Sequence, residues 1–138
     1  MSKRVLGYPF QNEKLIKRIA IDFDGTICEN KTKDKGYEDV EPLPGAIESL
    51  KKLKEMGFEI IIHTARNMAT CNNNVAKATA RQAPIIIEWC KKYDCPYDEL
   101  YFGKPHVDFF IDDKAIQFTT WEETMEKLDQ RTGELYDD

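Results

Sequence analysis

The stretch Ile19-Ala20-Ile21-Asp22-Phe23-Asp24-Gly25-Thr26 decides how this chain is expected to fold. Its first five residues form a short apolar run, which is typical of a buried β-strand, and the Asp-Gly pair that follows is typical of a turn. Two carboxylates, Asp22 and Asp24, therefore stand at the end of the predicted strand.

Strand and helix patterns alternate along the rest of the chain. Further strands are predicted over 58–62, 100–102 and 107–111. Helices are predicted from Pro44-Gly45 to a C-terminal cap at Gly57, from Pro84 to Tyr93, and from Thr120, where Glu123 completes a capping box. Such alternation predicts an α/β fold, a Rossmann-like three-layer sandwich with a mainly parallel sheet.

Polar side chains follow all four predicted strands. Because the carboxyl ends of parallel strands meet at one edge of a sheet, these side chains are expected to converge there. Like charges raise one another's pKa, and a divalent cation relieves their repulsion, so the acids predict a Mg²⁺ site that also holds a substrate phosphate. The residues concerned are Asp22, Asp24, Thr64, Lys104, Asp112 and Asp113.

This set of side chains is sufficient for phosphoryl transfer. One aspartate attacks phosphorus and becomes an aspartyl phosphate, and the second protonates the leaving oxygen and later activates water. Mg²⁺, Lys104, Thr64 and the backbone amides of the turn stabilise the charge on the phosphoryl group, which Gly25 allows to approach closely. Each residue alone also has a structural explanation as a turn, a cap or a solvated lysine, but the coincidence of four strand ends favours chemistry.

The residues 22–26 resemble the first motif of the haloacid dehalogenase (HAD) superfamily, and Thr64, Lys104 and Asp112-Asp113 resemble its second, third and fourth motifs. The resemblance covers about residues 19–118 and implies the HAD fold and its phosphatase branch. It implies that Asp22 is the nucleophile and Asp24 the general acid and base. It further implies that Mg²⁺ is held by Asp22, the backbone carbonyl of Asp24 and Asp112, with Asp113 as ligand or support.

A narrower resemblance covers the segments 64–68 and 95–99. They are similar to those of small HAD proteins associated with bacterial capsule and surface polysaccharide biosynthesis. This resemblance implies a small phosphorylated substrate: a sugar phosphate, a polyol phosphate or a nucleotide-linked form.

The two places where HAD proteins insert a cap domain hold little sequence here. The first, 27–42, is long enough for a flap, and the second, 67–83, for one loop and part of a helix. Neither can bury a core of its own, so the whole chain, 1–138, is expected to be one domain without a separate cap. The open site predicts a large substrate or a neighbouring subunit as lid, and hence a homo-oligomer, a dimer or tetramer.

Several residues beside the motifs are candidates for substrate contact: Gly25, Thr26, Ala65, Arg66, Asn67 and His106. Arg66 suits a second anionic group of the substrate, or else a structural ion pair. Asn67 either lines the entrance or forms a turn. His63, which precedes Thr64 on the predicted strand, is expected to face a helix.

Composition limits the partners and the compartment. The net charge is −5, from 20 basic and 25 acidic residues, which argues against a nucleic-acid binder. No run of about eighteen apolar residues is present, so no membrane span is expected. The four cysteines form no CxxC pair and are expected as free thiols in a reducing cytoplasm.

Two other classes of function remain as alternatives. A receiver-like regulatory module also accepts phosphate on an aspartate, but its paired acids precede the acceptor, whereas here Asp22 and Asp24 come first. A non-catalytic phosphate-binding module would retain the fold without turnover, although no motif position is lost. No GxxxxGK[ST] pattern is present, which argues against an ATP-driven kinase.

Overall fold

A parallel sheet forms the centre of the molecule. The computed structural model describes residues 4–5, 8–9 and 17–132. The strands β3 (Arg18–Asp22), β4 (Glu59–Thr64) and β5 (Glu99–Phe102) lie in the order β3-β4-β5, and all pair in parallel. Two short strands, β1 (Arg4–Val5) and β2 (Tyr8–Pro9), pair separately and antiparallel. The predicted α/β fold with a parallel sheet is confirmed.

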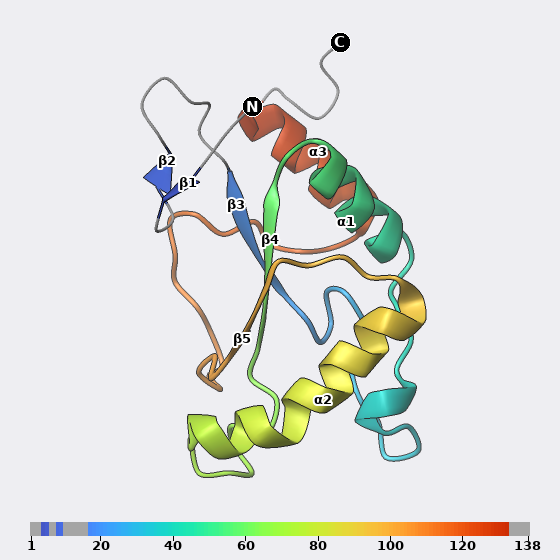
Figure 1. Ribbon diagram of the computed structural model, residues 1–138, viewed down its shortest axis with the longest axis vertical. Helices are drawn as coiled ribbons and strands as arrows, with labels where there is room; N and C mark the ends of the chain where they lie inside the picture. Colours follow the sequence, from blue (N-terminus) through green and yellow to red (C-terminus); the bar gives the residue numbers. More distant parts are fainter. Residues whose placement is uncertain (1–3, 6–7, 10–16, 133–138) are drawn as a thin grey trace.

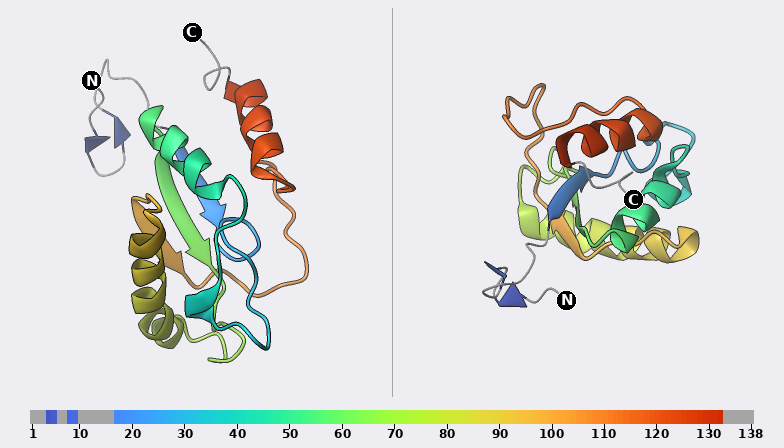
Figure 2. Two further views of the ribbon diagram at one scale, coloured as in Figure 1. Left: turned by 90° about the vertical axis from the view of Figure 1, so that its right-hand side faces the viewer. Right: turned by 90° about the horizontal axis from the view of Figure 1, so that it is seen from above.

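Helices cover both sides of this sheet (Figures 1 and 2). Helix α2 (Val75–Tyr93) lies on one side and α3 (Trp121–Thr132) on the other, while α1 (Ala46–Glu55) contacts both β4 and α3. A 3-10 helix, η1 (Tyr37–Asp39), contacts α2. No helix in the described ranges is long and apolar enough to cross a bilayer.

The core is built from side chains that the strands and helices direct inward. Phe23, Leu50, Leu53, Ile60 and Ile62 are buried, with Ile86 and Trp89 of α2 packed in the same cluster. The Trp89 indole meets the Phe23 ring edge-on at 5.0 Å and donates a 2.7 Å hydrogen bond to the Val40 carbonyl. The segment before α1 is thereby fastened to α2.

Helix ends follow the expected signals in two cases. The Glu123 N–H donates to Thr120 Oγ1 at 3.1 Å, which is the N-terminal half of the predicted capping box. Helix α1 ends at Glu55, and Gly57 takes the left-handed conformation (φ +94°) that a C-terminal cap requires.

Helix α2 begins earlier than predicted. Pro84 was expected to start it, but the helix starts at Val75, where the Asn74 side chain accepts a 3.1 Å hydrogen bond from the Lys77 N–H. An interior proline costs a helix about 3 kcal/mol. The additional turns bury Ala78 and Gln82, and this packing acts against the cost. Within the segment 67–83, residues 67–74 form a loop and residues 75–83 form the first turns of this helix.

The predicted strand over 107–111 is not formed. Residues 103–120 contain no helix or strand, and Phe109 is 87% exposed with Ile111 fully exposed. A short strand is not stable without a partner, and within the described residues β3 pairs only with β4. Gly103 (φ +91°) turns the chain at the end of β5, and the following segment does not return to the edge of β3.

Candidate active site

Asp22 is the last residue of β3 and marks the carboxyl edge of the sheet. It is paired with His63 of β4, and the next residue, Phe23, donates its N–H to the His63 carbonyl at 3.1 Å. The chain then turns sharply, because the Phe23 carbonyl accepts from the N–H groups of Ile27 and Cys28. Gly25 adopts φ +80° in this turn, a conformation that favours glycine.

Lys104 approaches Asp22 from the end of β5. Its Nζ lies 3.2 Å from Asp22 Oδ1, with 18% of the lysine side chain and 36% of the aspartate side chain exposed. The Lys104 N–H donates to the Thr64 carbonyl at 3.1 Å, which fixes its backbone against the end of β4. The structure thus brings together the first and third predicted motif residues.

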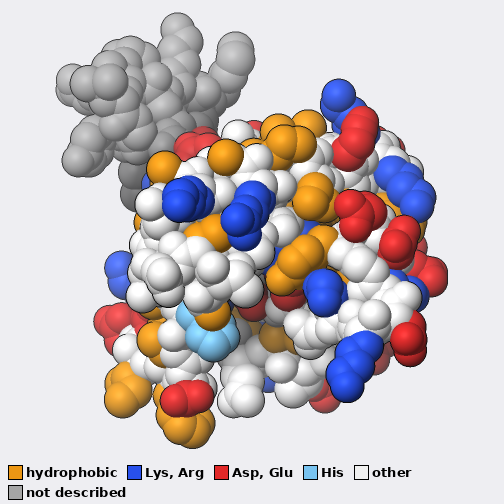
Figure 3. Space-filling model, turned by 90° about the horizontal axis from the view of Figure 1, so that it is seen from below, with side chains coloured by type: hydrophobic (Ala, Val, Ile, Leu, Met, Phe, Trp, Pro, Cys, Tyr) orange, Lys and Arg blue, Asp and Glu red, His pale blue; other side chains and the backbone are white. Residues whose placement is uncertain are grey.

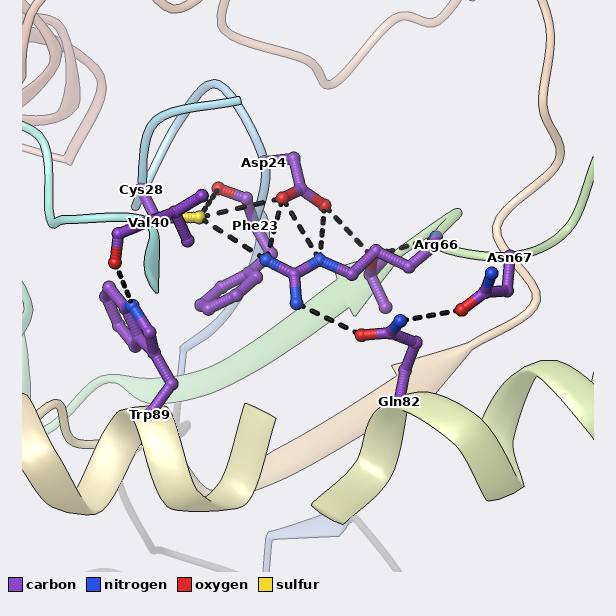
Figure 4. Close-up of polar contacts among 9 residues, drawn as sticks. Phe23, Asp24, Cys28, Val40, Arg66, Asn67, Gln82 and Trp89 are labelled. Carbon is purple, nitrogen blue, oxygen red and sulfur yellow. Dashed lines mark hydrogen bonds and ion pairs between the residues drawn. The ribbon is translucent and has the colours of Figure 1, made fainter. Parts of the chain in front are cut away.

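Asp24 points to a different partner (Figure 4). Both of its carboxylate oxygens accept from Arg66 Nε, at 2.9 and 3.1 Å, and Oδ1 also accepts from Arg66 Nη2 at 2.9 Å. Thr64 Oγ1 donates to Asp24 Oδ2 at 3.5 Å and accepts from the Arg66 N–H at 3.1 Å. Arg66 was expected to bind a second anionic group of the substrate or to form a structural ion pair, and in the structure it forms an ion pair with Asp24.

Cys28 completes the surroundings of Asp24. Its Sγ lies 3.6 Å from the Phe23 carbonyl oxygen and 3.7 Å from Asp24 Oδ1. Burial raises the pKa of the Cys28 thiol, and the charge of Asp24 raises it further. The thiol therefore stays protonated and serves as a hydrogen-bond donor.

A pocket of about 760 Å³ opens beside Asp22. The backbone edge of β3 and the inner face of α3 form its walls, and Thr26, His63, Lys104 and Asp112 contribute to its lining. Figure 3 looks onto the carboxyl end of the sheet, where hydrophobic side chains project beside a histidine at one side of a hollow.

His63 is a site residue whose position the sequence did not reveal. Its side chain is half-buried beside Asp22 and Lys104. Burial lowers the pKa of His63, the charge of Lys104 lowers it further, and Asp22 opposes both. The imidazole is therefore neutral near pH 7. The place of His63 beside Asp22 follows from the strand register, which pairs the two residues.

The paired acids Asp112 and Asp113 do not join the other carboxylates. Both lie exposed in the coil after residue 111, and Asp112 Oδ1 accepts a 2.7 Å hydrogen bond from the Lys114 N–H. Asp112 lines the same pocket as Asp22, but across 17–132 no three acidic, histidine or cysteine side chains form a group that could hold a metal ion. In this arrangement the donor set does not fit Mg²⁺.

The other candidates for substrate contact are dispersed. Thr26 lines the pocket and its carbonyl accepts from Trp121 Nε1 at 2.7 Å, while His106 is exposed on the coil. The Ala65 carbonyl accepts from the Met68 N–H, and Asn67 (φ +62°) donates to Thr70 Oγ1 at 2.8 Å. Ala65 and Asn67 thus build the turn after β4.

The chain matches a family model described as haloacid dehalogenase-like hydrolase over residues 19–97. A crystal structure of a protein from Vibrio cholerae is 38% identical, with a TM-score of 0.69 over 85% of this chain and 100% of that one. A conserved protein from Bacteroides thetaiotaomicron is 23% identical, with a TM-score of 0.50 over 89% of this chain and 99% of that one. No curated protein matches the chain.

A more distant likeness is to the D,D-heptose 1,7-bisphosphate phosphatase of B. bronchiseptica, whose structure is complexed with magnesium and phosphate. It is 14% identical, with a TM-score of 0.45 over 86% of this chain and 64% of that one. At this level the likeness concerns the chain path alone.

Proposed function

Because this chain belongs to the haloacid dehalogenase-like hydrolases, we propose that it is a phosphatase that cleaves phosphate monoesters with the carboxylate of Asp22 as its nucleophile. The observation that carries the proposal is the pair formed by Asp22 and Lys104. A nucleophilic carboxylate must be open to substrate, and 36% of the Asp22 side chain is exposed. An ammonium group 3.2 Å away can neutralise a phosphoryl oxygen at the same place.

The reaction proceeds in two displacements. In the first, an Asp22 oxygen forms a bond to phosphorus and the bond to the ester oxygen breaks. Asp24 takes up a proton before this step, against its ion pair with Arg66, and passes that proton to the leaving alcohol. In the second, water attacks the aspartyl phosphate while Asp24 takes the water's proton, which releases phosphate and restores Asp22. Lys104 Nζ acts as a donor to the phosphoryl oxygens, and Thr64 Oγ1 joins it by releasing its hydrogen bond to Asp24 Oδ2.

We further propose that the enzyme depends on Mg²⁺, which when bound would supply charge neutralisation for the phosphate. The ligands would be Asp22, the backbone carbonyl of Asp24 and Asp112, with Asp113 as ligand or support. The described arrangement does not form this site, and no step above is routed through it. Pairing of the segment 107–111 with the edge of β3 would carry Asp112 to the sheet edge beside Asp22, and that edge already lines the pocket they share.

The proposed substrate is a sugar phosphate, polyol phosphate or nucleotide-linked sugar phosphate of capsule or surface polysaccharide synthesis. The support is the resemblance carried by 64–68 and 95–99.

We propose that the chain is one domain without a cap and forms a homo-oligomer, a dimer or tetramer, whose neighbouring subunit covers the site. The termini of the 1–138 span lie outside the described residues. The proposed compartment is the cytoplasm, since all four cysteines are free thiols.

The experiment that tests the phosphatase is phosphate release from an aryl phosphate with Mg²⁺ present. Asp22→Asn is expected to abolish release, because the amide cannot form the aspartyl phosphate. Asp94→Asn is the matched control: Asp94 is 88% exposed and holds a left-handed φ that asparagine accepts. Full turnover by Asp22→Asn would refute the nucleophile, and phosphorylation of the wild type without turnover would favour the receiver-like or non-catalytic phosphate-binding alternative.

A further inference from the structure

The guanidinium of Arg66 is the most completely enclosed charge described near the site. Arg66 is 4% exposed, although it follows β4 by only two residues. A buried charge must be neutralised and hydrogen-bonded within the protein. The Arg66 guanidinium pairs with Asp24 through Nε and Nη2 and donates from Nη1 to Gln82 Oε1 at 3.1 Å (Figure 4).

Two aromatic rings lie against this guanidinium. The Arg66 Cζ atom lies 4.9 Å from the centre of the Phe23 ring and 4.3 Å from the centre of the Tyr37 ring. Phe23 is itself held edge-on by Trp89. Hydrogen bonds along its edge and rings beside it therefore hold the Arg66 group in place.

This fixed group determines the direction of the Asp24 carboxylate. Three hydrogen bonds from Arg66 and one from Thr64 constrain both Asp24 oxygens, so rotation of the carboxylate about its last bond is restricted. Only 22% of the Asp24 side chain is exposed, which leaves it a limited approach to solvent or substrate.

Gln82 connects Arg66 to the loop after β4. Gln82 of α2 is 2% exposed, accepts from Arg66 Nη1, and donates from Nε2 to Asn67 Oδ1 at 2.6 Å. The orientation of Arg66 therefore depends on how the loop 67–74 is seated against α2. Tyr37 makes the corresponding connection to the segment 27–42.

We propose that Arg66 is a positioning residue that orients the Asp24 carboxyl group toward the leaving oxygen of the substrate. The inference rests on the proposed phosphatase function and assigns Arg66 a role in its proton-transfer step. A misplacement of about 1 Å in a reacting group can cost about 100-fold in rate. Loss of Arg66 therefore slows esters whose leaving group needs a proton more than esters whose leaving group departs unaided.

The test compares the Arg66→Met and Arg66→Lys variants with wild type on a series of phosphate esters, from activated aryl to alkyl. Arg66→Met is expected to lower kcat on alkyl phosphates by about 10- to 100-fold, with a smaller loss on activated aryl phosphates and little change in KM. Arg66→Lys should recover part of the alkyl rate, since it restores the charge with fewer donors. Arg81→Met, on the exposed side of α2, is the matched control.

A double-mutant cycle with Asp24→Asn separates positioning from general structural support. If Arg66 acts through Asp24, adding Arg66→Met to Asp24→Asn lowers kcat on alkyl phosphates no further. Equal losses on all esters, a rise in kcat, or full additivity in the cycle would overturn the proposal. Failure of the phosphatase function would instead show as no Asp22-dependent turnover by the wild type.

Gln82→Leu keeps the proposal testable if Arg66→Met does not fold. It removes the Nη1 partner but leaves the Arg66–Asp24 ion pair in place. The Arg66→Met, Asp24→Asn double variant of the cycle likewise leaves no buried unpaired ion. Gln82→Leu is expected to change the same leaving-group dependence in the same direction but less strongly. If Arg66→Met does not fold, an unchanged leaving-group dependence in folded Gln82→Leu would overturn the proposal.

Discussion

Replacing Lys104 by methionine separates its part in stability from its part in chemistry. The Lys104 Nζ lies 3.2 Å from Asp22 Oδ1. At that distance the gross attraction between the two charges is about 5 kcal/mol for an effective dielectric constant of about 20. The side chains are 18% and 36% exposed, so screening and ordering reduce the net contribution to about 1 kcal/mol or less.

The expected effect on turnover is much larger than that on folding. Loss of one preorganised donor to the transferring group typically lowers kcat by about 10²- to 10³-fold. Lys104→Met is therefore expected to unfold in urea with nearly the wild-type free energy and to hydrolyse an aryl phosphate at least about 100 times more slowly. Lys91→Met, on the exposed surface of α2, should change neither quantity.

His63 gives an independent readout of the same substitution. The Lys104 charge contributes to the lowered pKa of His63, second only to burial. Removing that charge should raise the pKa of His63, which the pH titration of its ring protons by NMR would show. A kcat within tenfold of wild type, or an unchanged His63 titration, would refute the arrangement of Lys104 beside Asp22 and His63.

Three other predictions concern stability and the paired acids. The folded state lowers the pKa of His63 below its ordinary 6.5. The contribution of neutral His63 to the free energy of unfolding is therefore intact above pH 6.5 and is lost as the pH falls through the lowered pKa. Urea unfolding of wild type and His63→Gln at several pH values should diverge below pH 6.5. Added Mg²⁺ should slow hydrogen exchange of the 107–111 amides, with EDTA reversing the effect, and unchanged exchange would contradict strand pairing with β3. Trp89→Phe loses the hydrogen bond to Val40 and should lower the free energy of unfolding by about 1–2 kcal/mol; a loss below about 0.3 kcal/mol would contradict that contact.

The local signals that predicted the site were short-range ones. The apolar runs before Asp22, Thr64 and Lys104 identified three strands, and parallel pairing placed the strand ends at one edge. The meeting of Asp22 with Lys104 follows from that geometry alone. The positions of Asp22, Thr64 and Lys104 depend on where the strands end, and a few neighbouring residues are enough to predict that.

Side-chain partners distant in sequence could not be predicted in the same way. Arg66 donates to Asp24, which lies 42 residues earlier in the sequence. Its second partner, Gln82, lies on α2 before Pro84, in a part of the helix that a start at Pro84 leaves out. The signal for the true start was Asn74, which precedes a run of helix-forming residues and caps it. The run 107–111 has strand propensity, but pairing depends on an available edge, which propensity does not encode.

The proline inside α2 has a consequence for the rate of folding. The Ala83–Pro84 bond is trans in the native chain, yet about 10–30% of unfolded chains hold such a bond in the cis form. Those molecules cannot complete the helix that buries Trp89 until the bond isomerises, which takes tens to hundreds of seconds at 25 °C. A fraction of the population therefore reaches the native core late, and a prolyl isomerase would shorten the delay.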